Sequence, residues 1–174
     1  MAHRQLTGVL LVGGASTRFG SPKALAELDG ETFADRGRRV LGEACGEVLV
    51  VGKAGELPFA VIDDASEVRA PIAGVVAGLR AAAHDVCVFL PVDCVRVTPE
   101  VIRRLGEACR DAAVPQTGPL PGAWAKSALP VLEQRLADGP LALYRTYDAL
   151  DVAELEVDPS LLVDVDTPGE LLGF

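Results

Sequence analysis

The stretch that decides the fold reads Gly8-Val-Leu-Leu-Val-Gly-Gly-Ala-Ser-Thr-Arg-Phe-Gly-Ser-Pro-Lys-Ala-Leu25. The residues from Leu6 to Val12 are apolar almost throughout, which is typical of a strand buried on both faces of a parallel sheet. The glycines that follow allow a sharp turn whose backbone N–H groups can bind an anion. Arg18 and Lys23 add two cations to this turn. The stretch therefore predicts a strand that leads into a phosphate-binding loop.

Two better-known phosphate-binding loops do not fit this spacing. A Walker loop needs G-x-x-x-x-G-K-[ST], but Ser21 and Pro22 separate Gly20 from Lys23, and no Ser or Thr follows that lysine. A dinucleotide fingerprint needs G-x-G-x-x-G at the start of a helix, and Pro22 interrupts the first turns of such a helix. The remaining interpretation is a long irregular loop that wraps a triphosphate, and its alternative is an ordinary strand-to-helix connection with surface charges.

Length and composition favour one domain that spans residues 1–174. The 49% hydrophobic content of the 174 residues is enough for a sizeable core. The net charge of −9 argues against nucleic acid as a partner, because a phosphate backbone would be repelled over most of the surface. We find no signal-peptide pattern and no long uninterrupted apolar run, so we expect a cytoplasmic protein with no membrane partner.

The four cysteines indicate neither a zinc site nor a redox pair. They are scattered along the chain, and three of them lie within apolar stretches, where a free cysteine behaves as a small hydrophobe. We expect them to be reduced and mostly structural. Cys94 is the one to watch, because it follows Asp93 directly.

Apolar runs of strand length alternate with segments of helical period. Strands are predicted at Leu6–Val12, Glu47–Gly52, Phe59–Ile62, Val86–Pro91 and Leu161–Val165. Helices are predicted at Glu31–Cys45, Pro71–Ala83, Thr98–Cys109, Lys126–Ala137 and Leu141–Leu150. This alternation predicts an α/β fold of three layers, Rossmann-like, with a mostly parallel sheet and helices on both faces. Such sheets bind ligands at the carboxyl ends of their strands.

Acidic residues follow three of the predicted strands at that edge. Asp63 and Asp64 end the third strand, Asp93 ends the fourth, and Asp164 and Asp166 end the last. Carboxylates beside a phosphate loop would repel the ligand unless a hard divalent cation lay between them, so we infer Mg²⁺. For Asp166 a helix cap before Thr167 is the alternative, and these arguments do not separate Asp63 from Asp64.

With these residues assembled, the chain resembles the molybdenum cofactor guanylyltransferases and the wider group of nucleotidyltransferases that share their fold. The family loop L-A-G-G-x-S-x-R-M-G-x-D-K has the spacing of Leu11–Lys23. The family motifs P-L-A-G and P-x-D resemble Pro71–Gly74 and Pro91–Asp93. The closing N-x-N-T-P or D-x-D-T-P resembles Asp164–Pro168, so the matches span nearly the whole chain in the family's order.

The resemblance implies a fold like that of the nucleotide-diphospho-sugar transferases, and transfer of GMP from GTP, or a nucleotide from another NTP, to molybdopterin with Mg²⁺. It implies three catalytic residues, Arg18, Lys23 and Asp93. It implies nucleotide contacts by Leu11, Val12, Gly13, Gly14, Ser16, Lys23, Lys53, Asp64 and Asp93, and metal binding by Asp93 and Asp166. Transient contact with other cofactor-biosynthesis proteins also follows from it.

The chain departs from the family pattern at several positions. Phe19 replaces a methionine, Ser21-Pro22 replaces x-Asp, and the ending is D-V-D rather than N-x-N. A cytidylyltransferase, or a transferase with another small phosphorylated acceptor, therefore stays open, as does a nucleotide-binding homologue without turnover. An oxidoreductase that binds NAD is disfavoured by the missing fingerprint.

The turn-rich segment Pro115–Trp124 has two interpretations. It could form the wall of the acceptor site, with Trp124 offering an aromatic face to a pterin. A packed turn with a core tryptophan is the favoured alternative.

Overall fold

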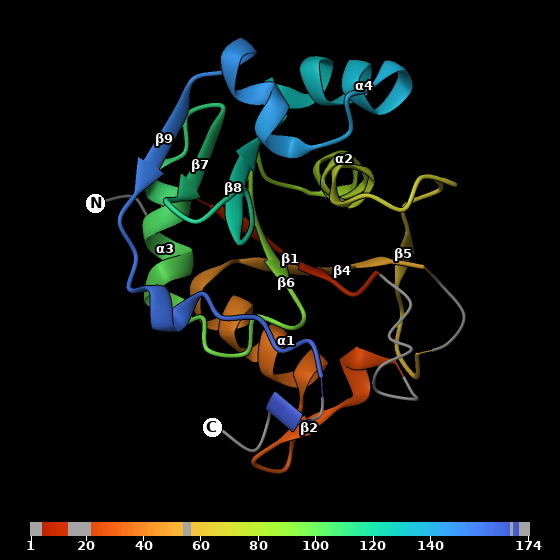
Figure 1. Ribbon diagram of the computed structural model, residues 1–174, viewed down its shortest axis with the longest axis vertical. Helices are drawn as coiled ribbons and strands as arrows, with labels where there is room; N and C mark the ends of the chain where they lie inside the picture. Colours follow the sequence, from red (N-terminus) through yellow and green to blue (C-terminus); the bar gives the residue numbers. More distant parts are fainter. Residues whose placement is uncertain (1–4, 14–21, 54–56, 168, 171–174) are drawn as a thin grey trace.

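The computed structural model describes residues 5–13, 22–53, 57–167 and 169–170. A seven-stranded sheet with the order β5-β4-β1-β6-β8-β7-β9 runs through the centre of the molecule (Figure 1). Its strands are β1 (Leu6–Leu11), β4 (Glu47–Gly52), β5 (Ile62–Asp63), β6 (Val86–Pro91), β7 (Ala112–Pro115), β8 (Gly122–Ala125) and β9 (Val152–Leu155). A two-stranded hairpin, β2 (Glu27–Leu28) with β3 (Glu31–Thr32), lies apart from this sheet.

Helices cover both faces of the sheet (Figure 1). On one face α1 (Phe33–Ala44) and α3 (Pro99–Ala108) pack into a core cluster that includes Leu10 of β1. On the other face α2 (Pro71–Ala81) and α4 (Leu129–Asp138) pack into a second cluster that includes Val9 of β1. Neighbouring residues of β1 thus enter opposite cores, as expected for a strand buried on both faces. The predicted three-layer α/β fold is confirmed.

A glycine sets the distance between α1 and β1. A Cβ atom added at Gly8 would lie 2.8 Å from the Cβ of Leu41, so a larger residue at this position would push the helix away from the sheet. Leu41 is fully buried at this contact. The close packing fixes α1 and the hairpin before it relative to β1. The chain continues from β1 into the glycine-rich segment, residues 13–22.

Three predicted helices are confirmed at nearly the predicted bounds. The hydroxyl of Thr32 accepts a hydrogen bond from the Asp35 N–H at 3.1 Å and caps α1. The hydroxyl of Thr98 accepts from the Val101 N–H at 3.4 Å, with Pro99 in the first turn of α3. The fourth, predicted from Lys126, starts as the 3₁₀ turn η3 (Lys126–Ala128) and continues as α4. The predicted helix Leu141–Leu150 is instead the 3₁₀ segment η4 (Leu143–Ala149).

The sheet contains a reversal that the sequence analysis did not predict. Four of its strand pairs are parallel, but β8 runs antiparallel to β6 on one side and to β7 on the other. The strands β7, β8 and β9 were not predicted. The sequences of β7, Ala-Ala-Val-Pro, and of β8, Gly-Ala-Trp-Ala, lack the runs of β-branched residues that are typical of strands. The resulting sheet is mixed, as in many α/β proteins.

Two other strand predictions need correction. The third strand is shorter than predicted and shifted, since pairing starts at Ile62 rather than Phe59. The predicted strand Leu161–Val165 is wrong: the 3₁₀ turn η5 (Pro159–Leu161) precedes a segment without regular secondary structure, outside the sheet. Asp158 accepts a hydrogen bond from the Ser160 N–H at 2.9 Å and starts this turn. The strand was predicted from the apolar residues alone, which carry no sign of the turn.

The helices of the described residues do not combine the length and apolarity that crossing a bilayer requires.

Candidate active site

The carboxyl ends of β4, β1 and β6 lie side by side. The Val12 N–H donates to the Val51 carbonyl at 2.9 Å, and the Val92 N–H donates to the Leu11 carbonyl at 3.0 Å. These bonds extend the parallel ladders one residue past β1 and β6. Gly13, Gly52 and Asp93, which follow directly, are therefore held at one edge of the sheet.

Three carboxylates gather at this edge. Asp93 follows β6, and its carbonyl accepts a hydrogen bond from the Val165 N–H at 3.0 Å. Val165 is fully buried and anchors the segment that follows η5, and Asp164 and Asp166 on either side of it lie against Asp93. One oxygen atom from each of the three carboxylates lies within 4.8 Å of the others. Oxygen donors at this spacing fit a hard cation such as Mg²⁺.

The metal prediction included Asp93 and Asp166 but not Asp164, which the sequence analysis named as a strand end. Along a strand such as the one predicted here, residues two apart point to the same side. This spacing was the available signal for Asp164, because it places Asp164 beside any ligand that Asp166 reaches.

Lys23 reaches into the same cluster from the far end of the glycine-rich segment. It opens the 3₁₀ turn η2 (Lys23–Leu25), which is held by a hydrogen bond from the Leu25 N–H to the Pro22 carbonyl and by burial of Ala24. The ammonium lies 3.3 Å from Asp93 Oδ2 and 3.4 Å from Asp166 Oδ1. The structure thus brings together Lys23, Asp93 and Asp166, which are far apart in the sequence.

The surroundings of Asp93 change the pKa of its carboxyl. Burial raises the pKa of this carboxyl, and the negative charge of Asp164 adds to the increase, while Lys23 opposes it. Because burial is the largest of these effects, the charged form of Asp93 is disfavoured relative to a carboxylate in water. Strained acidic groups of this kind are common in functional sites.

Cys94 beside Asp93 does not have the properties of a nucleophile. The thiol is buried and its Sγ lies 3.9 Å from Asp93 Oδ1. Burial and the charge of Asp93 raise the pKa of this thiol well above its usual range, so it stays protonated at neutral pH. The geometry therefore favours the structural role expected for the cysteines.

A second group of predicted residues lies next to Gly13. The Asp64 N–H donates to the Gly52 carbonyl at 3.1 Å, and the Lys53 ammonium pairs with the Asp64 carboxylate and with the Ser66 carbonyl. The side chain of Asp64 is 12% exposed, whereas that of Asp63 is 48% exposed. The structure thus distinguishes the two, since Asp64 is the more buried and lies 2.5 Å from the Lys53 ammonium, whereas Asp63 lies 4.0 Å from it.

The close approach of two backbones explains the glycine at position 52. A Cβ atom added at Gly52 would lie 2.9 Å from the Gly13 nitrogen and 2.9 Å from a methyl carbon of Val12. Any larger residue at position 52 would displace the first part of the glycine-rich segment. Gly14, Ser16 and Arg18, also predicted for the site, lie outside the described residues.

Trp124 is not available to a ligand. It lies in β8 with no exposed surface, packed in the second core cluster with Tyr147 at 6.3 Å between ring centroids. The favoured interpretation of a core tryptophan is confirmed. The turn between β7 and β8 nevertheless lies at the same sheet edge as Asp93, because β7 runs in the direction of β6.

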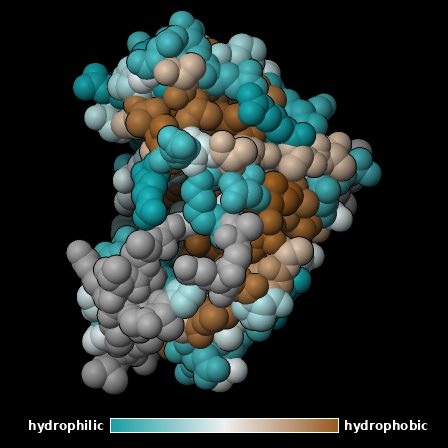
Figure 2. Space-filling model, turned by 90° about the vertical axis from the view of Figure 1, so that its right-hand side faces the viewer, coloured by the Kyte–Doolittle hydropathy of each residue, from teal (hydrophilic) through white to brown (hydrophobic). Residues whose placement is uncertain are grey.

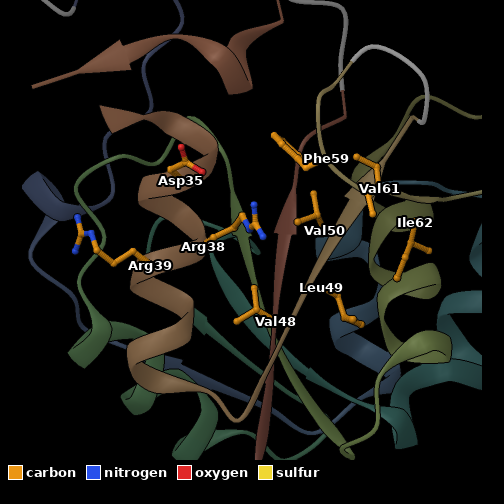
Figure 3. Close-up of a pocket in the computed structure, with 10 residues that line it drawn as sticks. Asp35, Arg38, Arg39, Val48, Leu49, Val50, Phe59, Val61 and Ile62 are labelled. Atoms are coloured by element: carbon orange, nitrogen blue, oxygen red, sulfur yellow. The ribbon is translucent and has the colours of Figure 1, made fainter. Parts of the chain in front are cut away.

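A groove of about 830 Å³ lies away from these residues, between α1, β4 and the segment 59–62 (Figure 3). In the described residues β5 pairs with β4 only at Val51 and Gly52, so the first half of β4 stays at the sheet edge. The guanidinium of Arg38 lies 5.6 Å from the ring centroid of Phe59 at the groove. Figure 2 views the β5 side, where hydrophobic side chains reach the surface. Of the predicted site residues that the structure describes, none lines the groove.

Comparison with known proteins identifies related sequences over nearly the whole chain. The model of the MobA-like NTP transferase domain family matches residues 8–168. A probable molybdenum cofactor guanylyltransferase from Pelotomaculum thermopropionicum is 34% identical over 142 residues, which cover 76% of this chain and 69% of the relative. The molybdenum cofactor guanylyltransferase of Desulfosudis oleivorans is 27% identical over 187 residues, covering 95% and 92%.

Solved structures show the same fold. Molybdopterin-guanine dinucleotide biosynthesis protein A from Archaeoglobus fulgidus superposes with a TM-score of 0.79 at 24% identity, covering 96% of this chain and 95% of that one. The 2-C-methyl-D-erythritol 4-phosphate cytidylyltransferase of Thermus thermophilus superposes with a TM-score of 0.74 at 19% identity, covering 94% of each chain. At these identities the likeness extends to the fold alone.

Proposed function

The chain belongs to the family of MobA-like NTP transferases and is a nucleotidyltransferase, and we propose that it transfers GMP from GTP to molybdopterin with release of pyrophosphate. The curated relatives named as molybdenum cofactor guanylyltransferases support this choice of substrates. The observation that carries the proposal is the approach of Lys23 to Asp93 and Asp166 at the carboxyl edge of the sheet. A cation beside a carboxylate cluster suits a substrate that carries both phosphate and metal.

In the proposed reaction the phosphate oxygen of the acceptor attacks the α-phosphorus of GTP. A bond forms between that oxygen and the α-phosphorus, and the bond from the α-phosphorus to the oxygen that bridges to the β-phosphorus breaks. The electron pair leaves with pyrophosphate. The transfer needs no covalent enzyme intermediate, so the protein acts by positioning the two substrates and by compensating charge.

Mg²⁺ fits the carboxylate cluster, and Asp93 and Asp166 would hold it together with Asp164. When bound, this ion neutralises phosphate oxygens and makes pyrophosphate a better leaving group. Lys23 places its positive charge next to the triphosphate, and Arg18 is proposed to do the same. Leu11, Val12 and Gly13, at the end of β1, are proposed to contact the nucleotide. Gly14 and Ser16 are proposed to continue these contacts.

Lys53 and Asp64 are proposed to contact the base. Both lie at the ends of neighbouring strands, next to Gly13, and they present an ammonium and a carboxylate side by side. Guanine offers hydrogen-bond acceptors at O6 and N7 and donors at N1 and N2, so this pair can bind both kinds of group.

The turn between β7 and β8 is proposed as the side of the site that binds the acceptor substrate. The single domain, the cytoplasmic location and transient contacts with other proteins of cofactor biosynthesis stay predictions.

The test of this proposal is the release of pyrophosphate from GTP, CTP and ATP, each supplied with Mg²⁺ and molybdopterin. We expect release with GTP that depends on molybdopterin, and much slower release with CTP and ATP. Preference for CTP would support the cytidylyltransferase alternative instead. Absence of release with every nucleotide, from protein that binds GTP, would contradict the proposal and support the homologue without turnover.

A further inference from the structure

The ammonium of Lys23 lies where two of the three clustered carboxylates converge. It is 3.3 Å from Asp93 and 3.4 Å from Asp166, and these same carboxylates offer oxygens within 4.8 Å of Asp164. A divalent cation held by this cluster would need the oxygens that Lys23 engages. Metal and lysine therefore compete for the same negative charge.

The contact is sheltered enough to affect binding. The side chains of Lys23 and Asp93 are 20% and 22% exposed, so their attraction is screened by water and salt less than that of a surface pair. Asp166 is 48% exposed and lies toward solvent, which gives an entering ion access from that side. Three carboxylates outnumber one ammonium, so the cluster still attracts a divalent cation while Lys23 is in place.

We propose that Lys23 is an internal counter-cation that couples metal binding to nucleotide binding. Without nucleotide, its ammonium neutralises Asp93 and Asp166 and weakens the affinity of the cluster for a divalent cation. A triphosphate offers Lys23 a second partner of higher charge, draws the ammonium away from the carboxylates and frees their oxygens. This inference rests on the proposed function, because it takes the triphosphate as that second partner.

The coupling has a reciprocal consequence. If nucleotide raises the affinity for metal by some factor, metal raises the affinity for nucleotide by the same factor. Removal of the ammonium should therefore change two quantities in opposite directions. Metal should bind more tightly to the nucleotide-free protein, and nucleotide should bind more weakly.

The experiment titrates Mn²⁺ into the metal-free full-length chain and measures bound ion by electron paramagnetic resonance. Three variants are compared with the original protein: Lys23→Met, Lys23→Arg and Lys126→Met. Lys126 is the matched control, because its ammonium binds the Ala82 carbonyl at the opposite edge of the sheet and its loss changes the total charge equally. Circular dichroism verifies that each variant is folded.

Without nucleotide, we expect Lys23→Met to bind Mn²⁺ about tenfold more tightly than the original protein, which corresponds to the loss of one coupled cation. Lys23→Arg and Lys126→Met should stay within about twofold of it, a range set by ordinary surface electrostatics. With a non-hydrolysable GTP analogue, the original protein should gain Mn²⁺ affinity beyond that of the analogue alone in solution, and Lys23→Met should lose most of this gain.

Unchanged or weaker Mn²⁺ binding by Lys23→Met would overturn the inference, as would an equal increase in Lys126→Met. This readout is independent of turnover. If the original protein binds Mn²⁺ and the analogue but transfers no GMP to molybdopterin, the proposed function fails while the coupling can still be measured.

Discussion

The two edges of the central sheet treat a partly buried carboxylate in opposite ways. At the amino edge, the carboxylate of Glu47 accepts hydrogen bonds from the Thr7 hydroxyl at 2.6 Å and from the Ala83 N–H at 2.9 Å, and these bonds lower its pKa. At the carboxyl edge, burial raises the pKa of Asp93, Lys23 opposes this increase and Asp164 adds to it. The charged form of Glu47 therefore stabilises the fold at the amino edge. The charged form of Asp93 is unfavourable at the carboxyl edge, where it can bind a ligand.

The largest expected effect is that of Asp93→Asn on activity. The substitution removes one charged oxygen ligand while keeping the shape of the side chain, so kcat for GMP transfer should fall about 1,000-fold. The same variant should be more stable without metal, because the disfavoured charge is gone. We expect Tm to rise by about 2–4 °C, as measured by thermal denaturation of the metal-free protein.

Near-normal turnover by Asp93→Asn would remove this residue from the mechanism. A lower Tm would instead show that the carboxylate stabilises the fold, and the contrast between the two edges would disappear.

Lys23→Met should produce the next largest effect. The loss of a charge next to the triphosphate should reduce kcat/KM for GTP about 100-fold, because one preorganised cation no longer opposes the negative charge that develops on pyrophosphate. Steady-state kinetics at saturating molybdopterin measure this change. Lys126→Met at the amino edge is the control, and kinetics as poor as those of Lys23→Met would indicate a general effect of net charge.

Glu47→Gln should show the reverse pattern of Asp93→Asn. Loss of the charge weakens the hydrogen bonds from Thr7 and Ala83, so unfolding free energy should fall by about 1–3 kcal/mol. Urea denaturation measures the loss, and kcat of the folded protein should stay within about twofold, since Glu47 lies at the edge of the sheet opposite the candidate site and distant sites act nearly independently. A loss of activity without a loss of stability would contradict the division between the edges.

The smallest predicted effect is the pH dependence of these two stability changes. Glu47 has a folded pKa below its unfolded value of 4.5, so its contribution is present above that value and is lost as pH falls through the folded pKa. Asp93 has a folded pKa above its unfolded value of 3.8, so its charged form destabilises the fold once pH rises through the folded pKa. At acid pH the Tm of each variant should therefore approach that of the original protein, from above for Asp93→Asn and from below for Glu47→Gln. Thermal scans from neutral to acid pH measure them.

Much of the carboxyl edge could be predicted because strand ends are local signals. Asp93 closes an apolar strand, and Lys23 follows the glycine-rich turn, so the rule for parallel sheets brings them to one edge. The predicted position of Asp166 is right, but the strand from which it was predicted does not exist. Its position depends on burial of Val165 and on one hydrogen bond to the Asp93 carbonyl, which are tertiary contacts that no local pattern contains.

The part of the sheet that contains β7, β8 and β9 was predicted poorly for a similar reason. The reversal at β8 depends on pairing with β6 and β7 on both sides, and its sequence, Gly-Ala-Trp-Ala, carries little strand preference. Pairing of Lys53 with Asp64 likewise depends on the register of β4 and β5. Tertiary contacts rather than local propensity decided these regions.

The most direct test of the central claim is the fate of a label on the α-phosphorus of GTP. We predict that, with Mg²⁺ and molybdopterin, the protein moves the α-label into a molybdopterin product while a label on the γ-phosphorus leaves as pyrophosphate, and that Asp93→Asn loses both processes together. Retention of the α-label in GDP or free GMP, with none in the molybdopterin product, would contradict nucleotidyl transfer at this edge of the sheet.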